Sequence, residues 1–304
     1  MVRATVRSSR AGLARCGESL VPEWPDLHVL RGRLADAFVG KHVTAVRVHD
    51  PLVLRATRPL PEALKGRELR DVVHRGRFLT FVFDDNTRLV INPMLSGLFD
   101  IVPTETKIRA TTAFALTFDG IGSSAPLKNA RDLRYRDDTR MGKVYLVEPG
   151  ASTADLPGFD RQGPEAGTLP WNADEFGRRA KQTRRELRNM LMSGDFIAGI
   201  GNAYADEILW QAKLHPKRRV TTLDEGEMDR LYAALRETLA RAVEIVEHDL
   251  PPELGTKIRT HMKIRGKVGD PCARCGTKIV RTRHGLDEMF VCPKCQPPPK
   301  GQLR

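Results

Sequence analysis

Near the C-terminus, residues 271–296 read PCARCGTKIVRTRHGLDEMFVCPKCQ, in which two C-x2-C pairs are separated by sixteen residues. Each pair can hold two thiolates about 2.3 Å from one tetrahedral zinc ion, and two such pairs complete its shell. Because four thiolates leave no position for water, the predicted zinc is structural and stabilises a segment too short to form a core. Disulfides or chance spacing are the alternative. We therefore expect one structural Zn²⁺ with four ligands: Cys272, Cys275, Cys292 and Cys295.

The residues around these cysteines predict a basic β-hairpin. Residues 278–283 and 288–291 have the composition of two strands, and Lys267 and Arg283 are among the many cations near them. A zinc ribbon alone does not identify a function, since ribosomal and transcription proteins also contain one. The finger therefore predicts a zinc-binding module, but it does not indicate a reaction.

The composition favours a polyanionic partner in a reducing compartment. The 304 residues include 50 Lys and Arg against 38 Asp and Glu, a formal net charge of +12. Neutralising phosphates releases counterions, so nucleic acid is a natural partner, although an inert basic surface gives the same charge. The fifth cysteine, Cys16, stands alone, which excludes a disulfide scaffold. Without an apolar run of eighteen residues or a secretory signal, we expect no membrane association and a cytoplasmic location.

Upstream of the finger, the pattern predicts a β-rich domain over residues 22–150. A leading helix is expected over 24–40, where apolar residues recur every three or four positions. Short β-rich runs follow it. The predicted strands cover residues 43–48, 72–83, 88–92, 114–118 and 144–147.

The second half of the chain predicts a helical domain. Residues 151–174 are rich in Pro and Gly and are expected to form a linker, and residues 175–260 carry apolar stripes with helical spacing. The finger then covers 261–296 and a flexible tail 297–304.

A glycine-containing turn lies between two of these helical patterns, in the sequence IAGIGNAYA at 197–205. Gly199 and Gly201 allow a close backbone approach, and Asn202 begins the next helix, where its side-chain oxygen is expected to cap free N–H groups. The same turn can direct N–H groups and the Asn202 amide at a phosphate. A capped turn without a ligand is the alternative, although a run of Arg residues over 178–188 favours DNA.

Five segments together resemble one known family. They are Pro22-Glu23-Trp24-Pro25-Asp26, a loop ending at Ser96-Gly97, the segment 133–137 with Arg140, the turn 199–205, and the finger. In this order and spacing, the chain is similar to the formamidopyrimidine-DNA glycosylase/endonuclease VIII family from residue 22 to residue 296. The resemblance implies a multidomain α+β fold with an N-terminal β-sandwich and a leading helix. A helix–two-turn–helix domain and a C-terminal zinc-finger β-hairpin follow.

The resemblance also implies a reaction. In that family the N-terminal proline attacks C1′ of the damaged nucleotide, expels the base and leaves an iminium that drives elimination of the 3′ phosphate. Pro22 is then the nucleophile, and Glu23 is the proton shuttle. We expect Glu23→Gln to slow base removal and to leave DNA binding nearly intact. The partner is damaged double-stranded DNA, bound by a monomer in the bacterial nucleoid. The residues expected to contact this DNA or to fill the gap left by the everted base are Arg77, Leu95, Arg140, Met141, Asn202, Lys267 and Arg283.

A nucleophilic proline must be the first residue, yet 21 residues precede Pro22. If the Val21 codon is an alternative start such as GTG, removal of the initiator Met exposes the amine of Pro22. On this interpretation residues 1–21 come from a start codon assigned too far upstream. If the extension is real, Pro22 lies in an amide and is no nucleophile.

The chain departs from the family at three places. Arg77 stands where the family has a Lys, Asp287 stands where the hairpin tip presents an Arg, and residues 92–95 read NPML where a His-led sequence is usual. Arg keeps the charge but transfers no proton. Three hypotheses follow: a DNA glycosylase/AP lyase of altered lesion preference, a damaged-DNA-binding protein without excision activity, and a zinc-ribbon translation or transcription protein.

Overall fold

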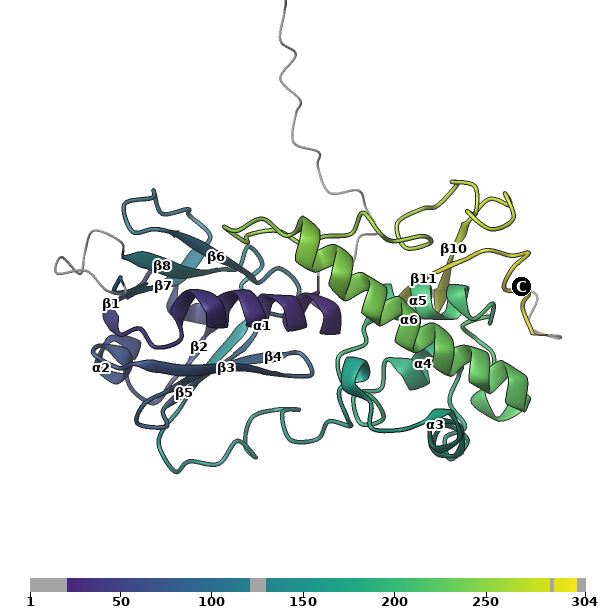
Figure 1. Ribbon diagram of the computed structural model, residues 1–304, viewed down its shortest axis with the longest axis horizontal. Coiled ribbons are helices and arrows are strands. Elements are labelled where there is room, and N and C mark those ends of the chain that lie inside the picture. Colours follow the sequence, from purple (N-terminus) through teal and green to yellow (C-terminus); the bar gives the residue numbers. More distant parts are fainter. Residues whose placement is uncertain (1–20, 121–129, 285–286, 300–304) are drawn as a thin grey trace, which may run out of the picture.

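A computed structural model describes residues 21–120, 130–284 and 287–299 of the chain. A β-rich lobe and a helical lobe lie side by side, and the segment after residue 150 crosses from one to the other along one edge (Figure 1). The predicted extension falls almost entirely outside the described residues, since their first is Val21. This arrangement confirms the predicted multidomain α+β fold.

The β-rich lobe consists of two sheets whose apolar inner faces form one core. The helix α1 (Trp24–Phe38) buries Leu27, Leu34 and Phe38 against this core, as its periodicity predicts. A short helix α2 (Leu60–Leu64) and a 3-10 turn η1 (Pro51–Val53) precede the second sheet's long strands. The first sheet has the order β1 (Val43–Val48), β7 (Thr112–Phe118), β8 (Arg131–Arg136) and β6 (Leu98–Pro103); the second has the order β2 (Leu54–Arg55), β9 (Lys143–Val147), β5 (Arg88–Asn92), β4 (Phe78–Phe83) and β3 (Leu69–Arg75).

The structure corrects two expectations about these strands. The predicted strand 72–83 is two antiparallel strands, β3 and β4, because the chain reverses at Gly76, which has a φ of 55°. The strands β6 and β8 were not predicted. The pattern of β8 is masked by buried charges: Arg134 pairs with Asp132, and Arg136 pairs with Asp100 of β6. Paired charges inside a sheet do not produce the alternation of apolar and polar residues that predicts a strand.

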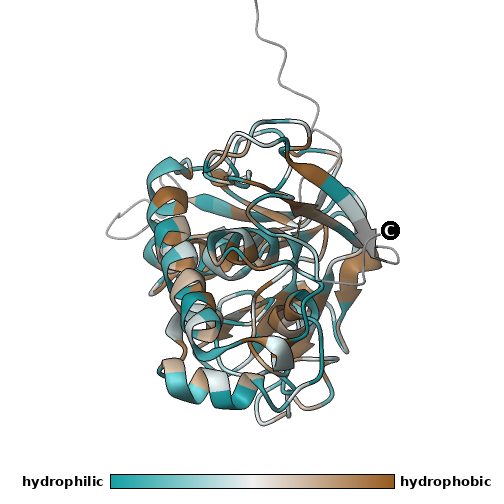
Figure 2. Cartoon of the chain, turned by 90° about the vertical axis from the view of Figure 1, so that its right-hand side faces the viewer, coloured by the Kyte–Doolittle hydropathy of each residue, from teal (hydrophilic) through white to brown (hydrophobic). Residues whose placement is uncertain are grey.

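The helical lobe is organised around one long helix, α6 (Glu225–Asp249), which packs against α1 and α5. Its Leu231, Leu235 and Leu239 belong to the helical core, whereas Val246 near its end enters the core of the β-rich lobe. Figure 2 shows hydrophilic and hydrophobic residues alternating along the helices. The remaining elements are η2 (Ala166–Thr168), α3 (Ala173–Ala180), α4 (Leu187–Leu191), α5 (Asn202–Gln211), η3 (Val220–Thr222) and the hairpin β10 (Val280–His284) and β11 (Asp287–Val291). Within the described ranges, no helix has the length and apolarity needed to span a bilayer.

Candidate functional site

The four C-terminal cysteines converge on one point. Their Sγ atoms all lie within 4.8 Å of one another, and two of the pairs, Cys275 with Cys292 and Cys272 with Cys295, are 3.4 and 4.0 Å apart. Thiolates around a tetrahedral zinc ion lie about 3.8 Å apart, so the spacing fits this metal. Gly276 closes the first knuckle with a φ of 73° and donates its N–H to the carbonyl of Cys272 at 2.8 Å. The protein therefore binds one structural Zn²⁺, as predicted.

The finger is fastened to helix α5. The indole of Trp210 donates a hydrogen bond to Cys272 Sγ at 3.4 Å, and the guanidinium of Arg274 stacks on the same indole at 4.2 Å. Buried Gln296 donates to the carbonyl of Leu214 at 3.0 Å. Because residues at both C-x2-C turns contact the helical lobe, the bound metal fixes the hairpin relative to α5.

Removal of one thiolate is expected to release the metal. Cys275→Ser leaves three sulfur ligands, so the purified variant should contain less than about one tenth of the zinc of the parent chain. The β-rich core contains no finger residue and should stay folded. Elemental analysis and circular dichroism check both expectations, with Cys16→Ser as the control. Folded parent protein without zinc would contradict the assignment.

The start of α5 is capped by a residue that lies 178 positions before Gly201 in the sequence. Glu23 is 2% exposed, and its Oε1 accepts a hydrogen bond from the N–H of Ala203 at 2.8 Å. Its Oε2 accepts from the N–H groups of Gly201 at 2.8 Å and Tyr204 at 3.1 Å. A carboxylate is favourable here because it meets free N–H groups and the positive end of the helix dipole.

The two glycines of the turn make this contact possible. A Cβ on Gly201 would lie 2.7 Å from the carboxyl carbon of Glu23, and Gly199 has a φ of 91°. The carbonyl of Gly199 also accepts the N–H of Trp24 at 2.7 Å. Burial raises the pKa of Glu23 above its ordinary value, although Arg259 and the three N–H groups oppose this shift. The sequence Pro22-Glu23-Trp24 is thus held directly against the turn.

The expectation that Asn202 caps α5 is wrong, because Glu23 occupies the N–H groups that a cap would bind. Instead, Asn202 Oδ1 accepts a hydrogen bond from Arg188. Arg188 is 2% exposed and also pairs with Asp206, whose other oxygen accepts from Arg265 at 2.8 Å. Both guanidinium groups donate to the carbonyl of Glu288 in β11. This buried network fixes the orientation of the Asn202 amide and joins it to the zinc hairpin.

Four of the predicted site residues line one cleft. Pro22, Glu23, Arg77 and Asn202 surround a space of about 190 Å³ together with Gln162, Met192 and the turn glycines. Pro22 and Glu23 are buried, Asn202 is half-buried, and Arg77 is exposed. The cleft lies between the two lobes, since β4 follows Arg77 and α5 begins at Asn202.

Three further predicted residues lie on two neighbouring loops outside this cleft. Leu95 follows β5, and Arg140 and Met141 follow β8. Ser96 joins the loops, because its Oγ accepts the N–H of Thr139 at 2.9 Å and donates to Asp137. Arg140 has a φ of 55° and pairs with Asp50 at 2.6 Å, and Met141 is 49% exposed.

The last two predicted residues, Lys267 and Arg283, are not among the residues that line the cleft. Lys267 is half-buried and lies in the finger segment 261–296, before its first cysteine. Arg283 lies in β10 and Asp287 begins β11, but their side chains fall outside the described part of the structure.

Sequence patterns missed several residues of the site. In the sequence, Arg188 is only one of several cations in the run 178–188, and no sequence pattern marks Asp206 as a site residue. The segment 250–264 contributes Lys257 and Arg259, whose roles depend on contacts with the N-terminal segment. Arg259 makes a bidentate ion pair with Asp26 at 2.7 and 2.8 Å. Such contacts span more than 200 residues and leave no local pattern.

Comparisons with known proteins agree with this geometry. The formamidopyrimidine-DNA glycosylase N-terminal domain model matches residues 21–144, its H2TH domain model matches 162–250, and the zinc finger model found in FPG and IleRS matches 269–298. The formamidopyrimidine-DNA glycosylase of Thermus thermophilus is 32% identical over 283 residues, covering 91% of this chain and 98% of that protein. That of Heliobacterium modesticaldum is 30% identical over 288 residues, covering 91% and 100%.

Solved structures are similar as well. The crystal structure of the MutM (Fpg) protein from Thermus thermophilus superposes with a TM-score of 0.76 at 31% identity, covering 90% of this chain and 98% of that one. The Lactococcus lactis Fpg in complex with abasic-site DNA has a TM-score of 0.77 at 23% identity and covers 91% and 100%, a likeness that concerns the fold alone.

Proposed function

We propose that the amine of Pro22 is the nucleophile of this protein. The chain belongs to the formamidopyrimidine-DNA glycosylase family and is a base-excision-repair DNA glycosylase with AP lyase activity. The observation that carries this proposal is the cleft that brings together Pro22, Glu23 and Asn202 from segments about 180 residues apart in the sequence. The zinc-ribbon alternative accounts for the finger alone, whereas the family models also match both lobes. Borohydride trapping on an abasic-site duplex is the direct test.

The chemistry follows from a secondary amine with an ordinary pKa near 8. Its neutral form attacks C1′, and the C1′–N bond to the base breaks as the base leaves with a proton. The C1′–O4′ bond then opens, O4′ takes up a proton, and the resulting iminium withdraws electrons while C2′ loses a proton and the 3′ phosphate departs. Glu23 is placed beside this amine, and its raised pKa favours accepting a proton. Its fixed position on three N–H groups supplies the preorganisation that proton transfer requires.

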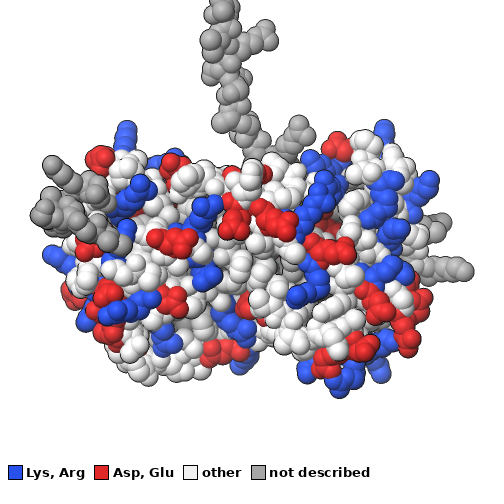
Figure 3. Space-filling view, viewed as in Figure 1, with Lys and Arg blue, Asp and Glu red and all other residues white. Residues whose placement is uncertain are grey.

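The partner in this proposal is damaged double-stranded DNA. Leu95, Arg140 and Met141 lie on two loops that Ser96 joins, which supports a role in filling the gap left by an everted base. Asn202 and Arg77 line the cleft, which supports contacts of both side chains with the backbone around the damaged nucleotide. Lys and Arg gather over the part of the molecule that carries the finger, at the upper right of Figure 3.

The exchange at Arg77 supports an altered lesion preference. Arg77 is exposed and lines the cleft, so it retains a cation for phosphate but offers no amine for proton transfer. We infer weak activity on oxidised purines and more robust cleavage at abasic sites.

The same proposal includes the state and the organisation of the chain. One chain acts as a monomer on the DNA of a bacterial cytoplasm. Its parts are a catalytic domain over 22–150, a linker over 151–174, a helix–two-turn–helix domain over 175–260, the finger over 261–296 and a tail over 297–304.

Loss of the Asn202 amide is expected to weaken binding to all duplexes equally. Asn202→Ala should lower affinity about tenfold irrespective of sequence, because a hydrogen bond to a phosphate positions the protein and reads no base. Asn202 is neutral, so the slope of log affinity against log salt should not change. Lys267→Ala should instead reduce that slope by about 1. Asn189→Ala, an exposed position of α4, is the control. Loss of binding to one sequence only would count against the assignment.

A further inference from the structure

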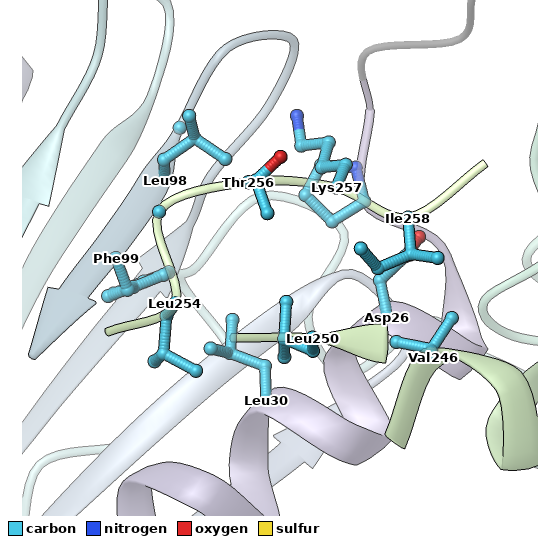
Figure 4. A pocket seen from close by; sticks show the side chains of 13 residues that line it. Asp26, Leu30, Leu98, Phe99, Val246, Leu250, Leu254, Thr256, Lys257 and Ile258 are labelled. Carbon is cyan, nitrogen blue, oxygen red and sulfur yellow. The ribbon is translucent and has the colours of Figure 1, made fainter. Parts of the chain in front are cut away.

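One amine of the site has no role in the proposed mechanism. Lys257 lies in the segment between α6 and the finger, and its Nζ donates a hydrogen bond to the carbonyl of Leu95 at 3.2 Å. It lines a small cavity of about 30 Å³, partly open to solvent, together with Pro22 and Asp26. In Figure 4 its amine points away from the apolar floor formed by Leu30, Leu250 and Leu254. Lys257 therefore shares a cavity with the predicted nucleophile and touches the loop predicted to enter the duplex.

The surroundings of this amine favour its neutral form. Burial lowers the pKa of Lys257 to about 8, and Arg259 adds to this effect, while Asp26 and Asp137 oppose it. The carboxylate of Asp26 is already engaged by both terminal nitrogens of Arg259. Among the described residues, the hydrogen bond to Leu95 is the one polar contact of the Lys257 amine. A cation without a carboxylate partner loses its proton more readily when it is desolvated.

We propose that Lys257 is a second nucleophilic amine of this centre, which forms a Schiff base with the aldehyde of an abasic site when the nitrogen of Pro22 is acylated. This inference rests on the proposed function, because it assumes that an abasic nucleotide enters the space beside Pro22. It requires no atom of Pro22 to react. Lys257 also provides a primary amine, whereas the guanidinium of Arg77, which lines the neighbouring cleft, does not.

The step balances without an added oxidant or reductant. The neutral Nζ adds to C1′ of the ring-opened sugar, and the carbinolamine loses water to give an iminium. Loss of a proton from C2′ then breaks the bond between C3′ and its oxygen, and the 3′ phosphate leaves. Water hydrolyses the remaining imine and restores the amine.

The test uses the whole 304-residue chain, in which Val21 acylates Pro22. The chain is incubated with an abasic-site duplex and borohydride, and the reduced adduct is located by peptide mass mapping. We expect the adduct on Lys257, with a yield that rises about tenfold from pH 7 to pH 9 as an amine of pKa about 8 is deprotonated. Lys257→Arg should lower the yield at least tenfold while zinc content and duplex affinity stay at parental values.

Two controls separate this inference from its premise. Lys263→Arg, at an exposed position six residues after Lys257, should trap normally. A chain with one Gly before Pro22 acylates the same nitrogen without the extension and should also trap at Lys257. If a chain beginning at Pro22 traps normally but neither acylated form reacts at Lys257, or if their adducts spread over other lysines, the inference is wrong and the proposed function stands. If the chain beginning at Pro22 also traps nothing, the proposed function fails.

Discussion

Protein whose first residue is Pro22 is expected to form a borohydride-trapped adduct with an abasic-site duplex, located on Pro22, and Pro22→Gly should lower its yield about 100-fold. The pyrrolidine ring fixes the nitrogen beside Glu23, whereas a terminal Gly amine rotates freely and loses the advantage of a fixed orientation. Pro22 is buried and lines both the cleft and the cavity that it shares with Lys257. Peptide mapping measures which residue carries the sugar.

The matched control is the chain that retains residues 1–21. Its Pro22 nitrogen is part of an amide whose lone pair is delocalised, so no adduct should map to Pro22. Comparable duplex affinity of both forms would show that the difference concerns chemistry. If the chain beginning at Pro22 binds lesion duplexes but no adduct forms at this residue, the amine mechanism is wrong and the chain behaves as a damaged-DNA-binding protein.

The parts of this molecule that the sequence predicts correctly depend on local chemistry. Two C-x2-C pairs specify a zinc site because the ligands of each pair lie within one turn. Helix α1 follows from the spacing of Leu27, Leu34 and Phe38, and the predicted strand 43–48 coincides with β1. In each case the relevant contacts lie within a few residues or depend on one repeating face.

The parts that the sequence does not predict depend on contacts between distant segments. β8 is a buried strand with the sequence RDLRYR, and its charges are tolerated because partners such as Asp100 come from another strand. The cap of α5 is Glu23, 178 residues before Gly201, so the local rule that assigns this role to Asn202 fails. The altered pKa of Lys257 likewise requires the burial that α1 and the Leu95 loop supply.

The cap contacts change the result expected for Glu23→Gln. Both carboxylate oxygens accept N–H groups, so a Gln side chain must direct its own NH₂ group at one of these donors. The lost hydrogen bonds and the unsatisfied N–H should cost about 1–3 kcal/mol where α1 meets α5. Because Asn202 lies in the same turn, duplex affinity should fall several-fold, in contrast to the expectation from sequence alone.

Base removal should fall further than binding, by about 100-fold or more, since the variant also lacks the proton-accepting carboxylate. Single-turnover excision, duplex affinity and melting temperature separate the two effects, with Glu253→Gln at an exposed position as the control. Trapping at a preformed abasic site needs no base removal and should be reduced less than excision. Equal losses in excision, trapping and affinity would mean that Glu23 acts only by holding the turn. Parental values of all three would contradict both the capping and the catalytic role.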